Sequence, residues 1–373
     1  MPDLTLFLTL RIFSATGGIE KVSRVAGKAL YELTAEHTGD TLKVFSMYDD
    51  QGDVQEKYFP AGIFRGFSKK KLKFVYTALR EGTNCKQVIL SHSNLLVAGY
   101  LIKLISPKTR VILLAHGIEV WSPFPFLKRS MLKSCDLILA VSRFTKAKML
   151  AVHGLDEKKI VVLNNCLDPF LQAPLPAAKN QQLLQRYELT PDHIVLITLT
   201  RLSFTERYKG YDNVLYAVRD LKEVYPQIKY IIVGKYDKAE KERVDAIITE
   251  LMLKDHIIFT GFIPDNELAA HYNIADLYIM PSKKEGFGIV FIEAMYYSRP
   301  VIGGNKDGTV DALCDGRFGL LINPDEKQEI TNAIIKVISN KADFIPDISE
   351  VMAKFSFPVY KQNLKEVLGK VEG

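Results

Sequence analysis

Two glutamates flank a glycine-containing loop in residues 279–295. An apolar run breaks at Pro281, Glu285 comes directly before Gly286-Phe287-Gly288, and helical periodicity then resumes and carries Glu293. This order predicts a strand, a loop and a helix. Such a loop brings backbone N–H groups and a helix N-terminus to one point, which favours an anion such as a phosphate. At the rise of a helix the two carboxylates would lie roughly 8 Å apart or more, so they could hold two separate groups of one ligand.

Two cations follow another apolar run, in residues 200–210. Arg201 stands directly after the run, and Lys209 comes just before the next helical pattern. A positive pair at one loop suits a leaving diphosphate, because charge-assisted hydrogen bonds are worth about 1.5–3 kcal/mol each. Losing one preorganised donor at a developing charge typically costs about 10²–10³ in rate. Arg207 lies in the same segment and competes with Lys209 for this role.

Weaker candidate binding motifs follow two apolar runs in the first half of the chain. Gly17 and Gly18 come after the first run, and paired glycines let a phosphate or sugar touch the main chain. They are not part of a G-x-G-x-x-G pattern, so the dinucleotide fingerprint of a dehydrogenase is absent. His116 ends a later run. The nearby Glu119 and Trp121 fit either a contact with the acceptor of a transferred group or simple loop packing.

An acidic cluster, Asp49, Asp50 and Asp53, follows the second run. We interpret it as a solvated turn, because no apolar strand presents these carboxylates as a paired metal site. With Arg201 and Lys209 present, a divalent ion is unnecessary for stabilising a leaving group. We therefore expect neither a metal nor a cofactor.

The elements that must position these residues alternate along the chain. In the first half, strands are predicted at residues 4–10, 42–47, 88–90, 111–115, 137–141 and 160–163, and helices at 20–31, 95–105, 126–133 and 145–152. In the second half, strands are predicted at 194–200, 228–233, 257–260, 277–280, 301–303 and 319–322, and helices at 211–224, 239–251, 265–274, 288–297, 309–313 and 326–339. Residues 47–74 are less regular and fit either extra strands or a mobile loop. Such alternation predicts parallel sheets with helices on both faces.

The length of 373 residues exceeds one typical core. Residues 167–176 contain three prolines and break the alternation. We expect an N-terminal Rossmann-like domain over residues 1–170, a linker over 171–190 and a C-terminal domain over 191–354. Doubly wound sheets bind ligands at the carboxyl ends of their strands. Two such domains facing each other therefore place the site in the cleft between them.

Residues 279–295 resemble the E-x7-E signature of retaining glycosyltransferases of family four, which have the two-domain GT-B fold. The resemblance implies that Glu285 contacts donor-sugar hydroxyls, that Glu293 holds the ribose, and that the donor is bound by residues 286–289, namely Gly286, Phe287, Gly288 and Ile289. Arg201 and Lys209 match the family's diphosphate-binding pair, although the segment between them is longer than in many members. A C-terminal helix, residues 355–373, resembles the element that returns to the first domain in this family.

The same resemblance extends to shorter motifs. It implies a donor-sugar contact for His116, contacts with donor phosphates and acceptor for Gly17 and Gly18, and a strand-end role for Gly234. It also implies nucleobase readout by Phe262 and Ile263 and a phosphate contact for Thr309.

Charge and composition limit the kinds of partner that the chain can bind. Up to residue 168 the chain has 24 Lys and Arg against 15 Asp and Glu, and the remainder has 25 against 28. The densest basic cluster spans residues 65–80 and fits either an anionic membrane surface or a solvated face. No nucleic-acid-binding module accompanies it. Four cysteines without a C-x-x-C pair, and a short apolar run at residues 4–10 without a basic leader, predict a cytoplasmic protein, at most peripheral to the inner face of the membrane.

The resemblance thus implies a retaining, metal-independent glycosyltransferase. It would move a hexose from a nucleotide diphosphate sugar, with UDP-glucose or a related UDP-sugar favoured over GDP-mannose, to an acceptor hydroxyl on a saccharide or lipid-linked saccharide. Surface-polysaccharide or glycolipid biosynthesis fits this activity. The alternatives are a catalytically inactive GT-B scaffold that binds sugar nucleotides and a two-lobed solute-binding protein, which would need an export signal.

Overall fold

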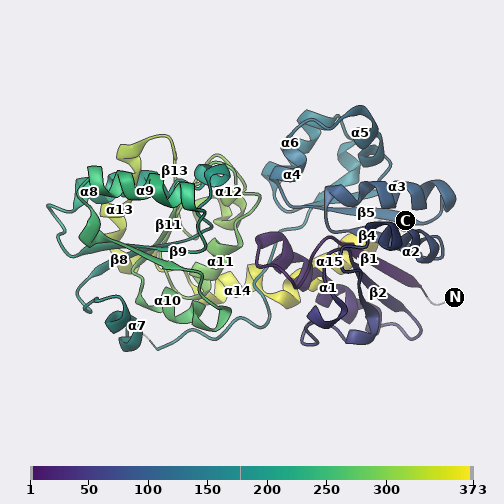
Figure 1. Cartoon of the computed structure of the whole chain (residues 1–373), viewed down its shortest axis with the longest axis horizontal. Coiled ribbons are helices and arrows are strands. Elements are labelled where there is room, and N and C mark those ends of the chain that lie inside the picture. The colour runs from purple at the N-terminus through teal and green to yellow at the C-terminus, as the bar shows by residue number, and fades with distance from the viewer. Residues whose placement is uncertain (1–2, 177, 370–373) are drawn as a thin grey trace. The chain divides into compact units, whose positions relative to one another are not determined.

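The computed structural model describes residues 3–176 and 178–369. The chain divides into two compact units (Figure 1), one formed by Met1–Pro169 with Phe355–Gly373 and the other by Phe170–Lys354. We call them unit 1 and unit 2. Parts of the predicted domains, residues 1–2, 177 and 370–373, lie outside the described residues.

Unit 1 is built on a sheet of parallel strands in the order β3-β2-β1-β4-β5-β6-β7. The strands are β1 (Leu4–Thr9), β2 (Thr41–Ser46), β3 (Phe64–Gly66), β4 (Gln87–Leu90), β5 (Arg110–Ala115), β6 (Leu137–Ala140) and β7 (Ile160–Val162). The helices are α1 (Gly18–Ala35), α2 (Lys71–Gly82), α3 (Leu96–Ile105), α4 (Ile118–Trp121), α5 (Phe126–Lys133), α6 (Arg143–His153) and α15 (Phe357–Gly369).

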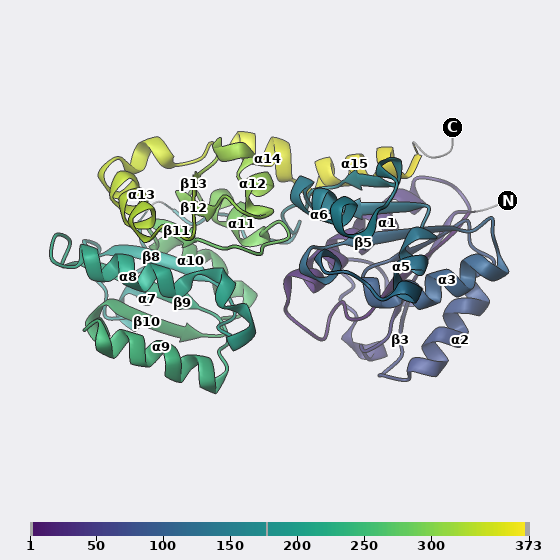
Figure 2. The same cartoon turned by 90° about the horizontal axis from the view of Figure 1, so that it is seen from above.

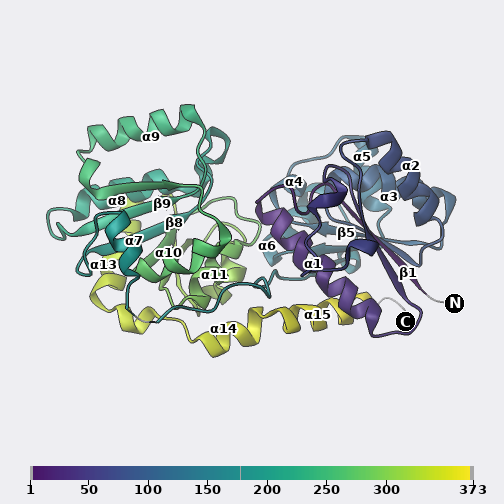
Figure 3. The same cartoon turned by 60° about the horizontal axis from the view of Figure 1, so that its bottom comes forward.

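Side chains of neighbouring residues in each strand point to opposite faces, so β1 supplies two cores. Leu6 and Leu8 pack with residues of α2, α3 and α5, while Phe7 packs with residues of α1 and α15. Figure 3 shows α1 and α15 side by side, although they lie at the two ends of the sequence.

Unit 2 has a second sheet of parallel strands, in the order β10-β9-β8-β11-β12-β13. The strands are β8 (Ile194–Leu199), β9 (Ile228–Val233), β10 (Ile257–Gly261), β11 (Leu277–Met280), β12 (Val301–Gly304) and β13 (Leu320–Ile322). The helices are α7 (Gln181–Arg186), α8 (Tyr211–Leu221), α9 (Lys238–Glu250), α10 (Leu268–Ile274), α11 (Ile289–Tyr296), α12 (Thr309–Ala312), α13 (Lys327–Ser339) and α14 (Ile348–Phe355). Figure 3 shows α8 and α9 on one face of this sheet and α10 and α11 on the other. The predicted α/β class with two doubly wound sheets is confirmed.

Short 3₁₀ helices connect several of these elements. They are η1 (Gln51–Asp53), η2 (Ala61–Ile63), η3 (Ser93–Leu95), η4 (Glu157–Lys159), η5 (Phe204–Lys209), η6 (Lys254–His256), η7 (Asp265–Glu267), η8 (Cys314–Gly316) and η9 (Lys341–Phe344). In the described part of the chain, no helix has both the length and the apolar character that a bilayer crossing requires.

Strand β3 lies in residues 47–74, where extra strands were one of the two alternatives that the sequence left open. Helices α2, α4 and α7 were not predicted. Helix α7 lies within residues 171–190, where we expected only a linker. The helix forms because Asn180 Oδ1 caps it, accepting a hydrogen bond from the N–H of Leu183 at 3.0 Å, and because Leu183 and Leu184 are buried.

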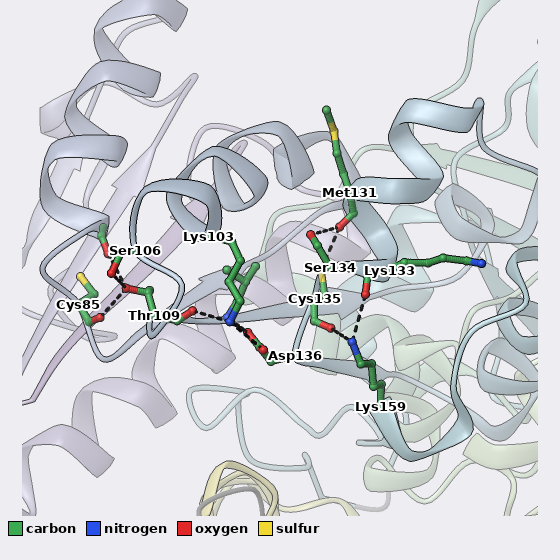
Figure 4. A network of polar contacts seen from close by, with 12 residues as sticks. Cys85, Lys103, Ser106, Thr109, Met131, Lys133, Ser134, Cys135, Asp136 and Lys159 are labelled. Atoms are coloured by element: carbon green, nitrogen blue, oxygen red, sulfur yellow. Dashed lines mark hydrogen bonds and ion pairs between the residues drawn. The ribbon is translucent and has the colours of Figure 1, made fainter.

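The amino edge of the unit 1 sheet is held by a structural polar network (Figure 4). Lys103 Nζ, from α3, donates to both carboxylate oxygens of Asp136 at 2.9 and 2.8 Å and to the carbonyl of Thr109 at 3.1 Å. Lys159 Nζ donates to the carbonyls of Lys133 and Cys135, each at 3.1 Å. Thr109, Asp136 and Lys159 each stand directly before a strand. Ligand-binding residues of a parallel sheet are therefore sought at its opposite, carboxyl edge.

Candidate functional site

Three loops interlock at the carboxyl edge of the unit 2 sheet, after the neighbouring strands β8, β11 and β12. The N–H of Lys283 donates to the carbonyl of Tyr208 at 2.9 Å, and the N–H of Gly308 donates to the carbonyl of Glu285 at 2.8 Å. A Cβ on Gly308 would lie 2.0 Å from the carbonyl oxygen of Gly286, so only glycine permits this approach. The loops thus form one connected structure.

An ion pair between Lys209 and Glu285 joins two of these loops. Both side chains are largely buried, with 18% and 12% of their surfaces exposed. Burial opposes the charge on Lys209, but the carboxylate of Glu285 outweighs it and raises the pKa of the amine. Lys209 is therefore an ammonium ion held in place before any ligand arrives. The structure brings together these two residues, which the sequence predicted for one site.

Asp307 belongs to a segment that resembles a donor-side loop of the family, without a predicted role of its own, and it fixes the loop that carries Glu285. Its Oδ2 accepts hydrogen bonds from the N–H of Glu285 at 2.7 Å and from Ser282 Oγ at 3.0 Å, and its Oδ1 accepts from the N–H of Thr309 at 2.9 Å. Burial, followed by the nearby charge of Glu285, raises the pKa of this carboxyl to about 6. An Asp directly before a Gly-Thr pair that starts a helix was the available signal.

Gly288 directly precedes α11, with a left-handed φ of 87°, and Phe287 before it is buried. Ile289 is the first residue of the helix, and Glu293 lies one turn further on, with 1% of its surface exposed. Burial and then the carboxylate of Glu293 raise the pKa of Tyr297. The predicted strand, glycine loop and helix are confirmed, and they place both glutamates at this edge of the sheet.

The two arginines of the loop after β8 have different surroundings. Arg201 is 65% exposed and pairs with Glu206. Arg207 donates from Nε to Oε2 of Glu240 at 3.0 Å, and Glu240 is fully buried on α9. Arg207 thus anchors the loop to a helix, which favours Lys209 over Arg207 as the cation available to a ligand.

The remaining predicted residues of unit 2 lie at the same edge. Gly234 has a φ of 144°, and a Cβ there would lie 1.9 Å from the carbonyl oxygen of Thr200. Phe262 is half exposed, follows β10 directly and precedes the partly buried Ile263. Thr309 starts α12, and its side chain is buried.

In unit 1, His116 follows β5 and is fixed from two sides. Its Nε2 lies 2.7 Å from the carbonyl oxygen of Ser91, and its N–H donates to Oε1 of Glu119 at 2.6 Å. A carbonyl accepts only, so Nε2 carries the proton and Nδ1 of the neutral ring is an acceptor. Within the described residues Nδ1 has no hydrogen-bond partner. Glu119 therefore takes part in loop packing, and its contact with an acceptor stays a prediction.

Gly17 and Gly18 start α1, and the loop before them is held by Asp49. The carboxylate of Asp49 accepts hydrogen bonds from the N–H groups of Ile12 at 2.7 Å and Ser14 at 2.8 Å, and from Ser46 Oγ at 2.6 Å. Our interpretation of Asp49 as part of a solvated turn is wrong, because its side chain is fully buried. These partners lie at neighbouring strand ends, which sequence spacing alone does not reveal.

No three His, Cys, Asp or Glu side chains among residues 3–176 and 178–369 are grouped in a way that could hold a metal ion. The four cysteines are free thiols.

Comparison with known proteins gives matches over most of the chain. The family model described as Glycosyltransferase Family 4 matches residues 29–169, and that described as Glycosyl transferases group 1 matches residues 181–354. A GDP-mannose-dependent alpha-(1-6)-phosphatidylinositol monomannoside mannosyltransferase of Mycolicibacterium smegmatis is 29% identical over 236 residues, which is 60% of this chain and 60% of that protein. An alpha-monoglucosyldiacylglycerol synthase of Acholeplasma laidlawii is 26% identical over 239 residues, 64% of this chain and 57% of that protein. The aligned region thus spans about 60% of the length of these relatives.

Among solved structures, Anabaena Alr3699/HepE in complex with UDP and glucose is similar to the whole chain, with a TM-score of 0.80 and 20% identity, covering 99% of this chain and 100% of that one. The likeness establishes the fold as GT-B. The two family models, the two Rossmann-like sheets and this fold together identify the chain as a member of the GT-B glycosyltransferases of family four.

Proposed function

We propose that the chain is a retaining, metal-independent glycosyltransferase that transfers a hexose from a nucleotide diphosphate sugar to an acceptor hydroxyl. The observation that carries this proposal is the ion pair of Lys209 and Glu285 within the interlocked loops of unit 2. One member offers a cation for a phosphate, and the other offers a carboxylate for sugar hydroxyls.

The leaving diphosphate gains negative charge as the glycosidic bond breaks. Lys209, whose pKa is raised, supplies a fixed positive charge without a metal ion, and Arg201 supplies a second, more exposed one. The Thr309 hydroxyl, buried at the start of α12, is proposed to bind a phosphate oxygen. Glu293, on α11, is proposed to bind the ribose.

Retention of configuration is proposed to proceed without a carboxylate nucleophile. Glu285 is already paired with Lys209, which lowers its availability for covalent attack. The acceptor hydroxyl would approach the face that the diphosphate leaves, and the departing phosphate oxygen would take its proton. His116 Nδ1, an acceptor in the neutral ring, is proposed to receive a hydrogen bond from a donor-sugar hydroxyl.

The donor is proposed to be UDP-glucose, a related UDP-sugar, or GDP-mannose. The name of the Mycolicibacterium smegmatis relative states that it depends on GDP-mannose, which supports GDP-mannose as a donor. The names of both relatives include a lipid, phosphatidylinositol monomannoside in one and monoglucosyldiacylglycerol in the other, which supports a lipid-linked saccharide as acceptor, in surface-polysaccharide or glycolipid biosynthesis.

The test is release of UDP or GDP from each donor by the purified full chain, with EDTA present. Lys209→Ala is expected to lower turnover by about 10²–10³-fold, because it removes a preorganised cation at the developing charge. Lys238→Ala is the matched control, since this lysine of unit 2 is 91% exposed.

Two results would refute the proposal. One is turnover by Lys209→Ala within about twofold of the control. The other is donor binding, seen as a raised melting temperature, without any release of nucleotide, which would indicate an inactive sugar-nucleotide scaffold.

A further inference from the structure

Large apolar side chains are exposed on three neighbouring helices of unit 1. Leu72 on α2 is 89% exposed, Phe126 on α5 is 88% exposed, and Tyr76, Val97 and Leu127 are also exposed. Helix α3 contacts both α2 and α5, and Figures 1 and 2 show the three in one layer. Burying such side chains is favourable, so exposure of several on adjoining helices indicates a contact surface.

Four of these side chains lie in the first turns of their helices. Leu72 and Val97 are the second residues of α2 and α3, and Phe126 and Leu127 are the first two of α5. The chain reaches these helices from the carboxyl ends of β3, β4 and β5, which are parallel. These four apolar side chains therefore lie toward the carboxyl edge of the sheet, where Gly17, Gly18 and His116 also lie, whereas the exposed Leu104 and Ile105 end α3 toward the amino edge.

Four lysines flank the α2 part of this apolar set. Lys69, Lys70, Lys71 and Lys73 are exposed at the start of α2. Their turn is fixed, because the N–H of Lys69 donates to the carbonyl of Met47 at 3.0 Å with a left-handed φ of 68°. We call Leu72, Tyr76, Val97, Phe126 and Leu127, with these four lysines, the helix-start surface.

The three helices and their flanks carry very little negative charge. Residues 69–82, 96–108 and 122–134 contain ten Lys and Arg and one acidic residue, Glu81. Glu81 is already paired with Lys43 and with Arg80, each at 2.7 Å. The surface thus presents a cationic face with apolar side chains.

We propose that the helix-start surface docks on an anionic lipid bilayer. Exposed Leu, Phe and Tyr side chains enter the boundary between headgroups and acyl chains, while lysines pair with headgroup phosphates. A second copy of this chain would bring the same cations against each other, so charge disfavours self-association. Nucleic acid would leave the exposed Leu and Phe side chains without a partner.

Docking in this way would turn the carboxyl edge of the unit 1 sheet toward the bilayer. That orientation presents the loops with Gly17, Gly18 and His116 to an acceptor carried by a lipid. This consequence rests on the proposed function, whereas bilayer binding itself does not require it.

The test is flotation of the full chain with phosphatidylcholine vesicles, with and without phosphatidylglycerol. We expect binding only with phosphatidylglycerol, and weaker binding at high salt. Lys70→Gln with Lys73→Gln should weaken the vesicle partition coefficient by about 30-fold at low ionic strength, since each lysine contributes about fivefold. Leu72→Ser with Phe126→Ser should weaken it by about tenfold or more.

Unit 2 offers matched controls. Lys238→Gln with Lys254→Gln changes two exposed lysines, and Val224→Ser with Met252→Ser changes two apolar residues that are 70% and 77% exposed. Equal effects of either surface pair and its control would overturn the proposal, as would equal binding to both vesicle types. A concentration-dependent increase in mass, removed by Leu72→Ser with Phe126→Ser, would assign the surface to a second copy instead. Nucleotide release measured without vesicles reports on the proposed function separately.

Discussion

Replacing Asp307 by Asn removes a carboxyl group that titrates in a pH range where stability can be measured. Burial and then the charge of Glu285 raise its pKa in the folded chain from 3.8 to about 6. The folded chain binds this proton more tightly than the unfolded chain does. The stability that the group contributes is therefore complete below about pH 4 and is lost as pH rises through about pH 6. The difference between the two pKa values corresponds to about 3 kcal/mol.

Other carboxyls also titrate in this range, so the comparison of variant with parent isolates Asp307. The Asn side chain has one hydrogen-bond-accepting oxygen, whereas the carboxylate has two, one for the N–H of Glu285 and one for that of Thr309. The loss of one acceptor lowers the free energy of unfolding by an amount that does not depend on pH. On raising the pH from about 4 to about 7, the variant should gain about 3 kcal/mol relative to the parent. For a unit of this size, that is about 6–12 °C in melting temperature.

The assay is the melting temperature of the full chain across this pH range, with Asp265→Asn as a baseline at an exposed carboxyl of the same unit. A difference between Asp307→Asn and the parent that stays constant with pH would refute the electrostatic reasoning. A difference that changes in the opposite direction would mean that the hydrogen bonds to Asp307 outweigh its burial.

Two further variants test how the loops are anchored. Glu240→Gln leaves Arg207 and Arg243 without their buried counter-charge and should destabilise unit 2 by about 3 kcal/mol or more, measured by urea unfolding. It should also lower turnover, because the loop with Lys209 loses its attachment to α9, and unchanged stability and turnover would contradict that role. Asp49→Asn should destabilise unit 1 by about 2 kcal/mol or more, because charge-assisted hydrogen bonds from the N–H groups of residues 12–14 are lost. Asp50→Asn is its control, and equal melting temperatures of the two would show that Asp49 is not an anchor.

The sequence predicted most strands and helices because their apolar periodicity matches their burial. Helix α2 escaped prediction because Leu72 and Tyr76 face outward while Phe74 and Ala78 face the core, so apolar residues occur around the helix rather than on one face. The same exposure carries the bilayer proposal. A failure of periodicity can therefore mark a functional surface.

Ion pairs between residues far apart in the sequence were harder to predict than helices and strands. Lys209 and Glu285 were assigned to one site because each follows a strand of the same parallel sheet, and the structure joins them. The choice between Lys209 and Arg207 depended on Glu240, which lies 33 residues beyond Arg207 and is buried. Local sequence contains no sign of that partner, because Glu240 looks like an ordinary helix-surface acid.

Asp49 and Asp307 show one arrangement in both units. Each stands three residues beyond the end of a strand, β2 for Asp49 and β12 for Asp307, and each accepts backbone N–H groups from the loop after the neighbouring strand, β1 or β11. Parallel strands lie about 4.8 Å apart, so loops leaving the same edge come within reach of one short side chain. Each aspartate also accepts a hydrogen bond from a serine hydroxyl, Ser46 or Ser282. The two aspartates therefore support their neighbouring loops in the same way, and at Asp307 burial and then the nearby carboxylate of Glu285 raise the pKa. An aspartate just past a strand of a parallel sheet is therefore better interpreted as an anchor for the adjacent loop than as a solvated turn.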